Sequence, residues 1–143
     1  MKTDSSDKAA TSHTVDIEVR YAETDQMGVV HHANYLVWFE LARTGLCALT
    51  GHDYPSIERA GYLILVTGAE LRYHRGARYG DRVQVEAWLD RLDSRGLQFS
   101  YVVRRDGERL AAGSTSHLWV EAETGRVCRI PSPWKEAFAA TRR

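Results

Sequence analysis

One segment with helical periodicity and almost no polar face constrains this chain more than any other feature. Its apolar side chains recur at steps of four and three residues, at Tyr35, Phe39, Ala42, Leu46 and Leu49. Trp38, Leu36 and Leu41 widen the apolar stripe until few polar positions remain. A helix of this composition must be covered on most of its sides. Gly51 stands where a residue with a left-handed backbone would end it, and Pro55 in YPSIERAG is typical of the start of a further short helical turn.

The apolar residues outside this segment alternate in the manner of strands. A first strand, ending near Tyr21, is predicted from the alternation of Val15, Ile17 and Val19 with charged residues. Two later strands are predicted with apolar faces at Val83, Val85, Ala87 and Leu89 and at Leu97, Phe99, Tyr101 and Val103. The Asp-Gly pair in RDGE favours a tight hairpin into a strand through Leu110, Ala112, Ser114, Ser116, Leu118 and Val120. ETGR then turns the chain into residues 127–130, and Pro131 and Pro133 precede a short C-terminal helix.

One mostly apolar helix with about five or six antiparallel strands is an α+β arrangement, in which the sheet must curl around the helix. The 143 residues fit a single domain, predicted to span 14–143, after a polar tail at 1–13 that we expect to be disordered. The curled sheet leaves one edge strand free, and a second copy of the chain is its simplest cover. We therefore expect a homodimer or a homotetramer.

Charge and cysteine content argue against several classes of protein. Lys and Arg together number 19, as do Asp and Glu, so no uniform basic field would draw the chain to nucleic acid or to an anionic membrane. Cys47 and Cys128 show no zinc-ligand or redox-motif spacing, which suits a reducing compartment. No apolar run is long enough to span a bilayer, and the polar N-terminus lacks the core of a secretory signal. We expect a cytoplasmic protein that neither binds nucleic acid nor inserts into a membrane.

The candidate site lies between the first strand and the apolar helix. Glu23 and Asp25 stand in this loop, and Gly28 lets it turn so that the helix begins around His32 or Ala33. The first turn of a helix has backbone N–H groups without internal partners, which can hydrogen-bond a carbonyl oxygen that gains negative charge. A carboxylate beside them could attack that carbonyl or deprotonate a water that does. The chain has no G-x-S-x-G elbow, so a carboxylate is the most economical candidate for acyl transfer.

Structural interpretations of the same residues stay open at this point. Asp25 could simply cap the helix or its preceding turn, and His31 with His32 could be an ordinary loop pair, since no third ligand stands at metal spacing. We therefore expect no metal and no cofactor. Glu40 is a second candidate carboxylate, although it could also pair with Arg43 or Thr44. The aromatic residues of the helix are typical of a core.

At these residues the sequence resembles a known family. YAETDQMGVVHHANYLVWFELART is similar to the signature of the hotdog-fold acyl-CoA thioesterases of the 4-hydroxybenzoyl-CoA thioesterase type, in particular the branch associated with the Tol-Pal cluster. The resemblance continues through ARYGDRVQVEAWL and HLWVEAETGRVCRIP and covers about residues 15–134. It implies a sheet wrapped around a central helix, in agreement with the periodicity.

The resemblance also implies roles for particular residues. Asp25 matches the catalytic carboxylate, as nucleophile or general base, and the backbone N–H of His32 lies where the helix start polarises the thioester carbonyl. Glu40 falls where another branch places its catalytic carboxylate, so a supporting role is implied. The chain departs from the pattern at Glu23, which replaces Asp, at His31, which replaces Tyr, and at Gly76, which replaces Pro before Ala77.

Two other functions compete with hydrolysis of acyl-CoA. A hotdog-fold hydratase or dehydratase would polarise a thioester in a similar way but needs Asp and His acting on the β-carbon. A non-catalytic acyl-CoA-binding protein would keep the fold and lose the carboxylate, whereas Asp25 is present.

A local basic cluster is the candidate site for the coenzyme. LRYHRGARYGDR holds Arg72, Arg75, Arg78 and Arg82 in an otherwise neutral chain. For any one of them a solvated surface position is the simple interpretation. Collectively, we expect one or two to contact the nucleotide phosphates of coenzyme A, which Arg binds through charge-assisted hydrogen bonds.

Overall fold

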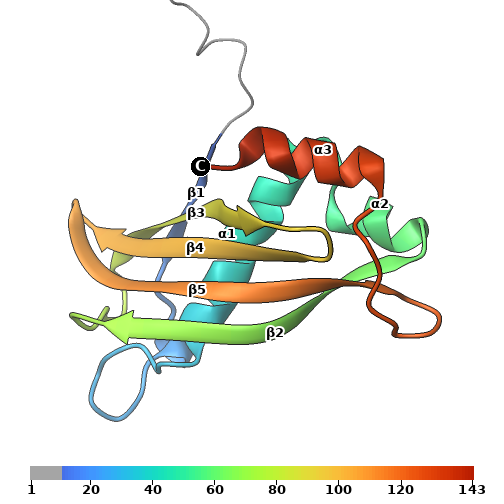
Figure 1. Ribbon diagram of the computed structural model, residues 1–143. Coiled ribbons are helices and arrows are strands. Elements are labelled where there is room, and N and C mark those ends of the chain that lie inside the picture. Colours follow the sequence, from blue (N-terminus) through green and yellow to red (C-terminus); the bar gives the residue numbers. More distant parts are fainter. Residues whose placement is uncertain (1–10) are drawn as a thin grey trace, which may run out of the picture.

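The computed structural model describes residues 11–143, and most of the predicted tail lies outside this range (Figure 1). The elements in chain order are β1 (His13–Glu18), a short 3-10 turn η2 (Tyr21–Glu23), α1 (Asn34–Leu49), α2 (Tyr54–Arg59), β2 (Tyr62–Tyr73), β3 (Arg82–Leu92), β4 (Gly96–Arg105), β5 (Glu108–Glu121) and α3 (Ser132–Thr141). The first strand thus includes His13, the last residue assigned to the tail.

The five strands form one antiparallel sheet in the order β1-β3-β4-β5-β2. The sheet curves around α1, which lies against its concave face, and α3 packs at one end (Figure 1). This confirms the α+β class and the curled sheet. The segment 127–130 adds no sixth strand, because it makes only an isolated bridge between Val120 and Val127 before Pro131.

The helix α1 has the predicted core face. Tyr35, Trp38, Phe39, Ala42 and Leu46 are each at most 2% exposed and pack against the sheet. The helix ends at Leu49, and Gly51 adopts φ +86° just beyond it, as predicted. The rest of the helix surface remains partly open within one chain, although the sequence predicts cover on most sides. Its exposed apolar side chains are Leu36, Val37, Leu41 and Leu49.

Strands β3 and β4 turn the predicted residues inward, and the hairpin between β4 and β5 has positive φ at Asp106 and Gly107. In β5 the buried side holds Thr115, His117 and Trp119, whereas Ser114 and Ser116 lie on the opposite face. A register shift next to Val103 separates the start of β5 from the rest of its pairing with β4. Alternation counted from Leu110 therefore does not identify the inner face farther along the strand.

Candidate active site

The loop that precedes α1 is tied to the domain at several points. The Glu23 side chain is almost fully buried and accepts hydrogen bonds from the Arg20 backbone N–H at 2.8 Å and from Trp38 Nε1 at 2.9 Å. Asn34 Nδ2 donates to the Glu23 carbonyl at 2.9 Å, which joins the loop to the first residue of α1. These contacts fix the start of the helix relative to the loop that carries Asp25.

Glu23 has a structural role that the sequence did not reveal. Burial alone would raise the pKa of Glu23, but the hydrogen bonds from Arg20 and Trp38, together with the Arg20 charge, hold that pKa below its ordinary value. The carboxylate is therefore ionised at neutral pH and occupied by protein donors. The signal that could have indicated this role is Trp38, whose indole N–H needs an acceptor when buried.

Asp25 combines a turn-forming oxygen with an unoccupied one. Oδ1 accepts hydrogen bonds from the backbone N–H groups of Met27 at 2.8 Å and Val29 at 3.4 Å, which holds the turn at Gly28, where φ is +82°. Within residues 11–143, Oδ2 receives no hydrogen bond. The turn-capping interpretation is thus correct for one oxygen, and the other is available to a water or a substrate.

The backbone N–H of His32 is also available. The N–H groups on either side are occupied, because His31 donates to the Glu23 carbonyl at 2.8 Å and Ala33 donates to His31 Nδ1 at 3.2 Å. The His32 N–H makes no hydrogen bond to any residue that the structure describes. The His32 carbonyl accepts a hydrogen bond from the Tyr73 hydroxyl at 3.0 Å, which connects the helix entrance to β2. One backbone donor is thus left free just before α1 begins.

A cavity of about 220 Å³ brings three of the predicted site residues together. Its lining includes Asp25, His32 and Arg75, together with Tyr35 and Tyr73. Gly76, also in the lining, permits close approach of the loop, because a Cβ there would lie 2.8 Å from Val29 Cγ1. Residues that carry a carboxylate, an available backbone donor and a cation therefore border a single space.

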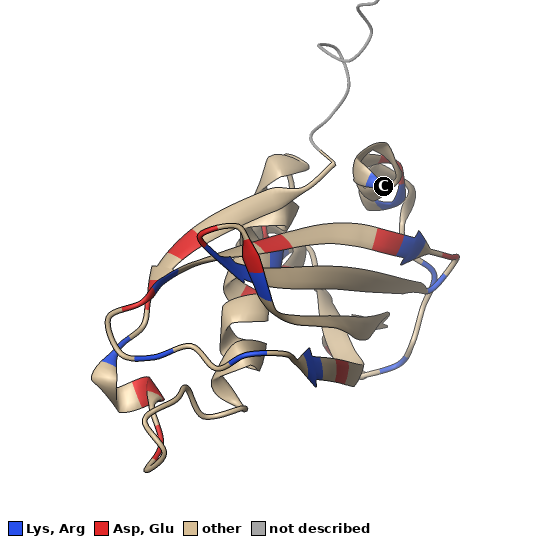
Figure 2. Cartoon of the chain, turned by 90° about the vertical axis from the view of Figure 1, so that its left-hand side faces the viewer, with Lys and Arg blue, Asp and Glu red and all other residues tan. Residues whose placement is uncertain are grey.

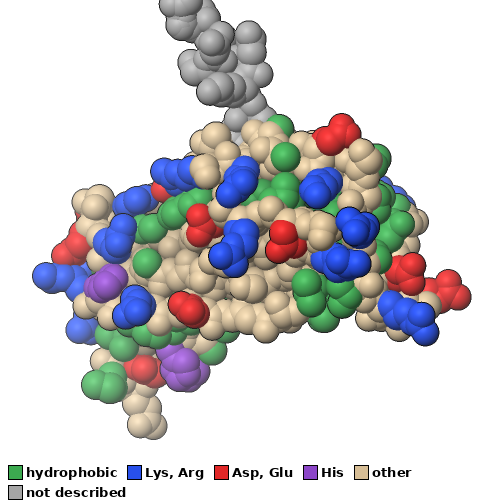
Figure 3. All heavy atoms as spheres, viewed as in Figure 1, with side chains coloured by type: hydrophobic (Ala, Val, Ile, Leu, Met, Phe, Trp, Pro, Cys, Tyr) green, Lys and Arg blue, Asp and Glu red, His purple; other side chains and the backbone are tan. Residues whose placement is uncertain are grey.

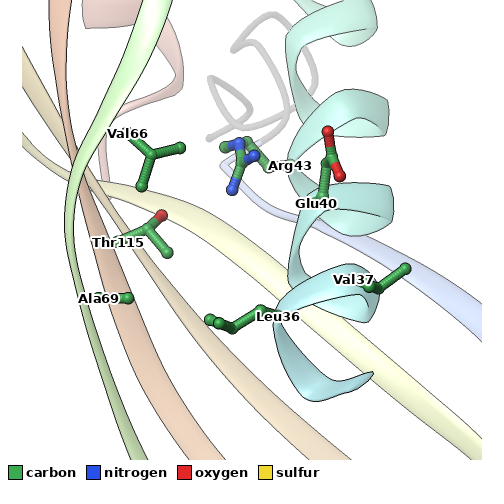
Figure 4. Close-up of a pocket in the computed structure, with 7 residues that line it drawn as sticks. All are labelled: Leu36, Val37, Glu40, Arg43, Val66, Ala69 and Thr115. Carbon is green, nitrogen blue, oxygen red and sulfur yellow. The ribbon is translucent and has the colours of Figure 1, made fainter. Parts of the chain in front are cut away.

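Glu40 lies elsewhere. It lines a second cavity, between α1 and β2, and not the one that holds Asp25 (Figure 4). Although Arg43 is only three positions farther along the helix, no ion pair links the two among residues 11–143. The alternative in which Glu40 pairs with Arg43 is therefore not realised in this range.

The four candidate arginines do not share one environment. Arg75 is ion-paired with Glu108 at 2.9 Å and Arg82 with Glu18 at 3.5 Å. Arg78 reaches the active-site loop, with Nη1 only 3.4 Å from the position of a Cβ at Gly28. Arg72 borders a different hollow with Gln98 and Ser100, on the sheet face opposite to its neighbour Tyr73.

The distribution of charged residues differs between the β2–β3 connection and the outer face of the sheet. The basic positions follow one another along the connection from β2 to β3, beside the acidic positions of the loop before α1 (Figure 2). Across the outer face of the sheet, basic and acidic side chains are interspersed (Figure 3). A positive edge next to the Asp25 cavity is thus provided mainly by the β2–β3 connection.

Neither a metal-ligand cluster nor a membrane-spanning helix is found in the described range. Residues 11–143 hold no group of three or more His, Cys, Asp or Glu side chains that could bind a metal ion. None of the helices in that part of the chain is long and apolar enough to cross a membrane.

Comparisons with known proteins identify the family. The model of the thioesterase-like superfamily matches residues 19–138, so the chain belongs to this superfamily. Among its relatives, YneP of Bacillus subtilis is 36% identical over 86% of this chain and 87% of its own length. A 1,4-dihydroxy-2-naphthoyl-CoA hydrolase of Thermosynechococcus vestitus is 30% identical over 80% of each chain.

A solved structure shows the same fold. The DHNA-CoA thioesterase of Staphylococcus aureus superposes with a TM-score of 0.85 at 31% identity, covering 90% of this chain and 89% of the other. The fold is therefore the hotdog fold expected from the resemblance.

Proposed function

We propose that the protein hydrolyses acyl-CoA thioesters to a free acid and coenzyme A, with Asp25 as the catalytic carboxylate. The observation that carries this proposal is that Asp25 and His32 line the same cavity, while one Asp25 oxygen and the His32 N–H make no hydrogen bond within residues 11–143. The names of the relatives, which specify CoA thioesters, support the substrate class. The finer assignments, to the 4-hydroxybenzoyl-CoA type with its Tol-Pal-associated branch and to the cytoplasm, stay predictions from the sequence.

The reaction follows from the two free groups. As a general base, Asp25 takes a proton from water while the oxygen of that water bonds to the thioester carbon. The carbonyl oxygen becomes an oxyanion and accepts a hydrogen bond from the His32 N–H. The C–S bond then breaks, the carboxylic acid is released, and the coenzyme A thiolate takes up the proton held by Asp25, which restores the carboxylate.

A nucleophilic route uses the same geometry. Oδ2 of Asp25 bonds to the thioester carbon, and loss of the coenzyme A thiolate leaves a mixed anhydride. Water then cleaves the anhydride and regenerates the carboxylate. Both routes need a negatively charged Asp25 and a donor for the oxyanion.

The reaction is expected to need no metal. Thiol release from a panel of acyl-CoA substrates should continue unchanged in the presence of a chelator, because Asp25 and the His32 N–H supply both the base and the oxyanion donor. A loss of activity on chelation that added metal restores would contradict this expectation.

Coenzyme A phosphates are proposed to contact the arginines of the β2–β3 connection. Arg75 and Arg78 lie next to the Asp25 cavity or its loop, so alanine at one or both should raise KM by about tenfold and leave kcat nearly unchanged. Such contacts are equally strong in the ground state and the transition state.

The matched controls for this prediction are Arg72→Ala, on the other face of the sheet, and Arg82→Ala, whose partner is Glu18. Steady-state kinetics on one acyl-CoA compare all four variants. A wild-type KM in every variant would place the phosphates elsewhere.

Self-association is proposed to cover the free sheet edge. Leu63 and Leu65 are 40% and 51% exposed on β2, one of the two edge strands, and Leu41 and Leu49 of α1 are exposed as well. Such a surface favours pairing with another copy. Light scattering in dilute solution should give the mass of a dimer or tetramer. A stable, active monomer would rule out this arrangement.

A further inference from the structure

The second cavity, between α1 and β2, has apolar walls and a cationic end. Its volume is about 270 Å³, near the lower end for small-molecule sites. Leu36 and Val37 of α1 and Val66 and Ala69 of β2 form the apolar walls. Arg43 borders the same space, and its side chain extends from α1 toward the strands (Figure 4).

The Arg43 guanidinium is held by two tyrosine hydroxyls, and one of its amino groups has no hydrogen-bond partner within residues 11–143. The residue is only 6% exposed, Nε donates to the Tyr54 hydroxyl at 2.9 Å and Nη1 donates to the Tyr101 hydroxyl at 3.0 Å. Nη2 makes no hydrogen bond within residues 11–143. This atom is also not fully enclosed by the protein. One amino group of the guanidinium thus remains accessible where Arg43 borders the cavity.

Arg43 makes no ion pair with any residue in the range 11–143. Burial raises the pKa of both Tyr54 and Tyr101, so these phenols stay neutral. Burial, reinforced by the Arg43 charge, lowers the pKa of His117 to about 3, so this ring is neutral as well. Glu40 borders the same cavity, but its side chain stays beside α1, whereas that of Arg43 extends toward the strands (Figure 4).

An uncompensated buried cation is costly, and a residue with only a packing role would not need the charge. A ligand that brings an anionic oxygen would both satisfy Nη2 and neutralise the guanidinium through charge-assisted hydrogen bonds. The cavity is otherwise apolar, so the part of the ligand between its entrance and Arg43 must be apolar.

The position of Arg43 along α1 sets the length of this apolar part. Leu36, which borders the cavity, lies in the first turn of the helix, four positions after His32. From Asn34 to Arg43 the helix rises by about 13 Å, at 1.5 Å per residue. An acyl chain of medium length would extend from the thioester toward the guanidinium.

We propose that the cavity between α1 and β2 binds the acyl group and that Arg43 selects substrates whose acyl chain ends in a carboxylate. This inference rests on the proposed thioesterase function and specifies its substrate as an ω-carboxyacyl-CoA. Arg43 acts in specificity and touches the far end of the substrate, not the reacting carbonyl.

The test compares two CoA thioesters of equal medium chain length, one ending in a carboxylate and the other in a methyl group. Isothermal titration calorimetry measures their dissociation constants with Asp25→Asn protein, in which turnover is suppressed, and with the Asp25→Asn/Arg43→Met double variant. We expect the carboxylate-ended thioester to bind at least about tenfold more tightly to the first protein. The preference should disappear or reverse in the second. Because each preference is a ratio within one preparation, a loss of folded protein cancels.

Arg43→Lys, which retains the charge, should keep part of the preference. Equal affinity for the two thioesters, no binding of either, or a preference that survives Arg43→Met would overturn the inference. Thiol release by wild-type protein is the separate readout for hydrolysis. Release without a binding preference refutes only the role of Arg43, whereas a binding preference without release from any thioester refutes the proposed hydrolysis.

Discussion

Replacing Asp25 by asparagine is expected to lower kcat by at least about a hundredfold while the protein stays folded. The amide keeps an oxygen that can accept from Met27 and Val29, so the turn is preserved. It removes the negative charge that a nucleophile or a base needs at the free oxygen position. Steady-state kinetics on one acyl-CoA give the loss in turnover, and the thermal midpoint checks that folding is unchanged.

Glu40→Gln is the matched control for this variant. It removes a carboxylate of the neighbouring cavity, which is not next to the Asp25 oxygen. A loss smaller than that of Asp25→Asn is expected. Wild-type turnover in Asp25→Asn would return Asp25 to a purely turn-forming role, and a larger loss in Glu40→Gln would move the catalytic carboxylate into α1.

A second large effect is expected at His32 from the backbone rather than from the ring. His32→Pro removes the N–H that is free at the helix entrance, and the loss of one oxyanion donor typically costs about a hundredfold to a thousandfold in kcat. Helix α1 begins at Asn34, and the His32 N–H has no partner within residues 11–143, so the variant breaks none of the hydrogen bonds in that range.

His32→Ala separates the backbone from the side chain, because it deletes the imidazole and keeps the N–H. We expect this variant to retain most of the wild-type kcat. Circular dichroism of both variants verifies that α1 is intact. Equal losses in the two variants would assign the effect to the ring, and an undiminished kcat in His32→Pro would exclude the N–H as the oxyanion donor.

Periodicity was sufficient to predict the main elements of the fold. The inner faces of β3 and β4 were predicted correctly, because each is a regular apolar pattern covered on one side. The core face of α1 was predicted correctly from Tyr35 to Leu46, whereas Leu49 of the same stripe is exposed. Glycine positions predicted the end of α1 and the β4–β5 hairpin, because their positive φ is a local requirement. The inner face of β5 was not predictable by simple alternation, since the register shift beside Val103 depends on pairing with β4.

The candidate site was only partly predictable. The sequence motif predicted Asp25 and His32 as site residues, and both line one cavity in the structure. The roles of Glu23 and Arg43 depend on partners far along the chain, Trp38 for the first and Tyr101 for the second, which no local pattern connects. The separation of Glu40 from Asp25 likewise became visible only in three dimensions.

The most direct measurement identifies the products by mass spectrometry after wild-type protein has been incubated with saturated and 2-enoyl-CoA thioesters. If the protein is a thioesterase, we expect free acid and coenzyme A in equal amounts, with no addition of water to the double bond of the enoyl substrates. A 3-hydroxyacyl-CoA product would show a hydratase instead. Intact thioesters throughout the panel would show a protein that binds acyl-CoA without hydrolysing it, and either result would contradict the central claim.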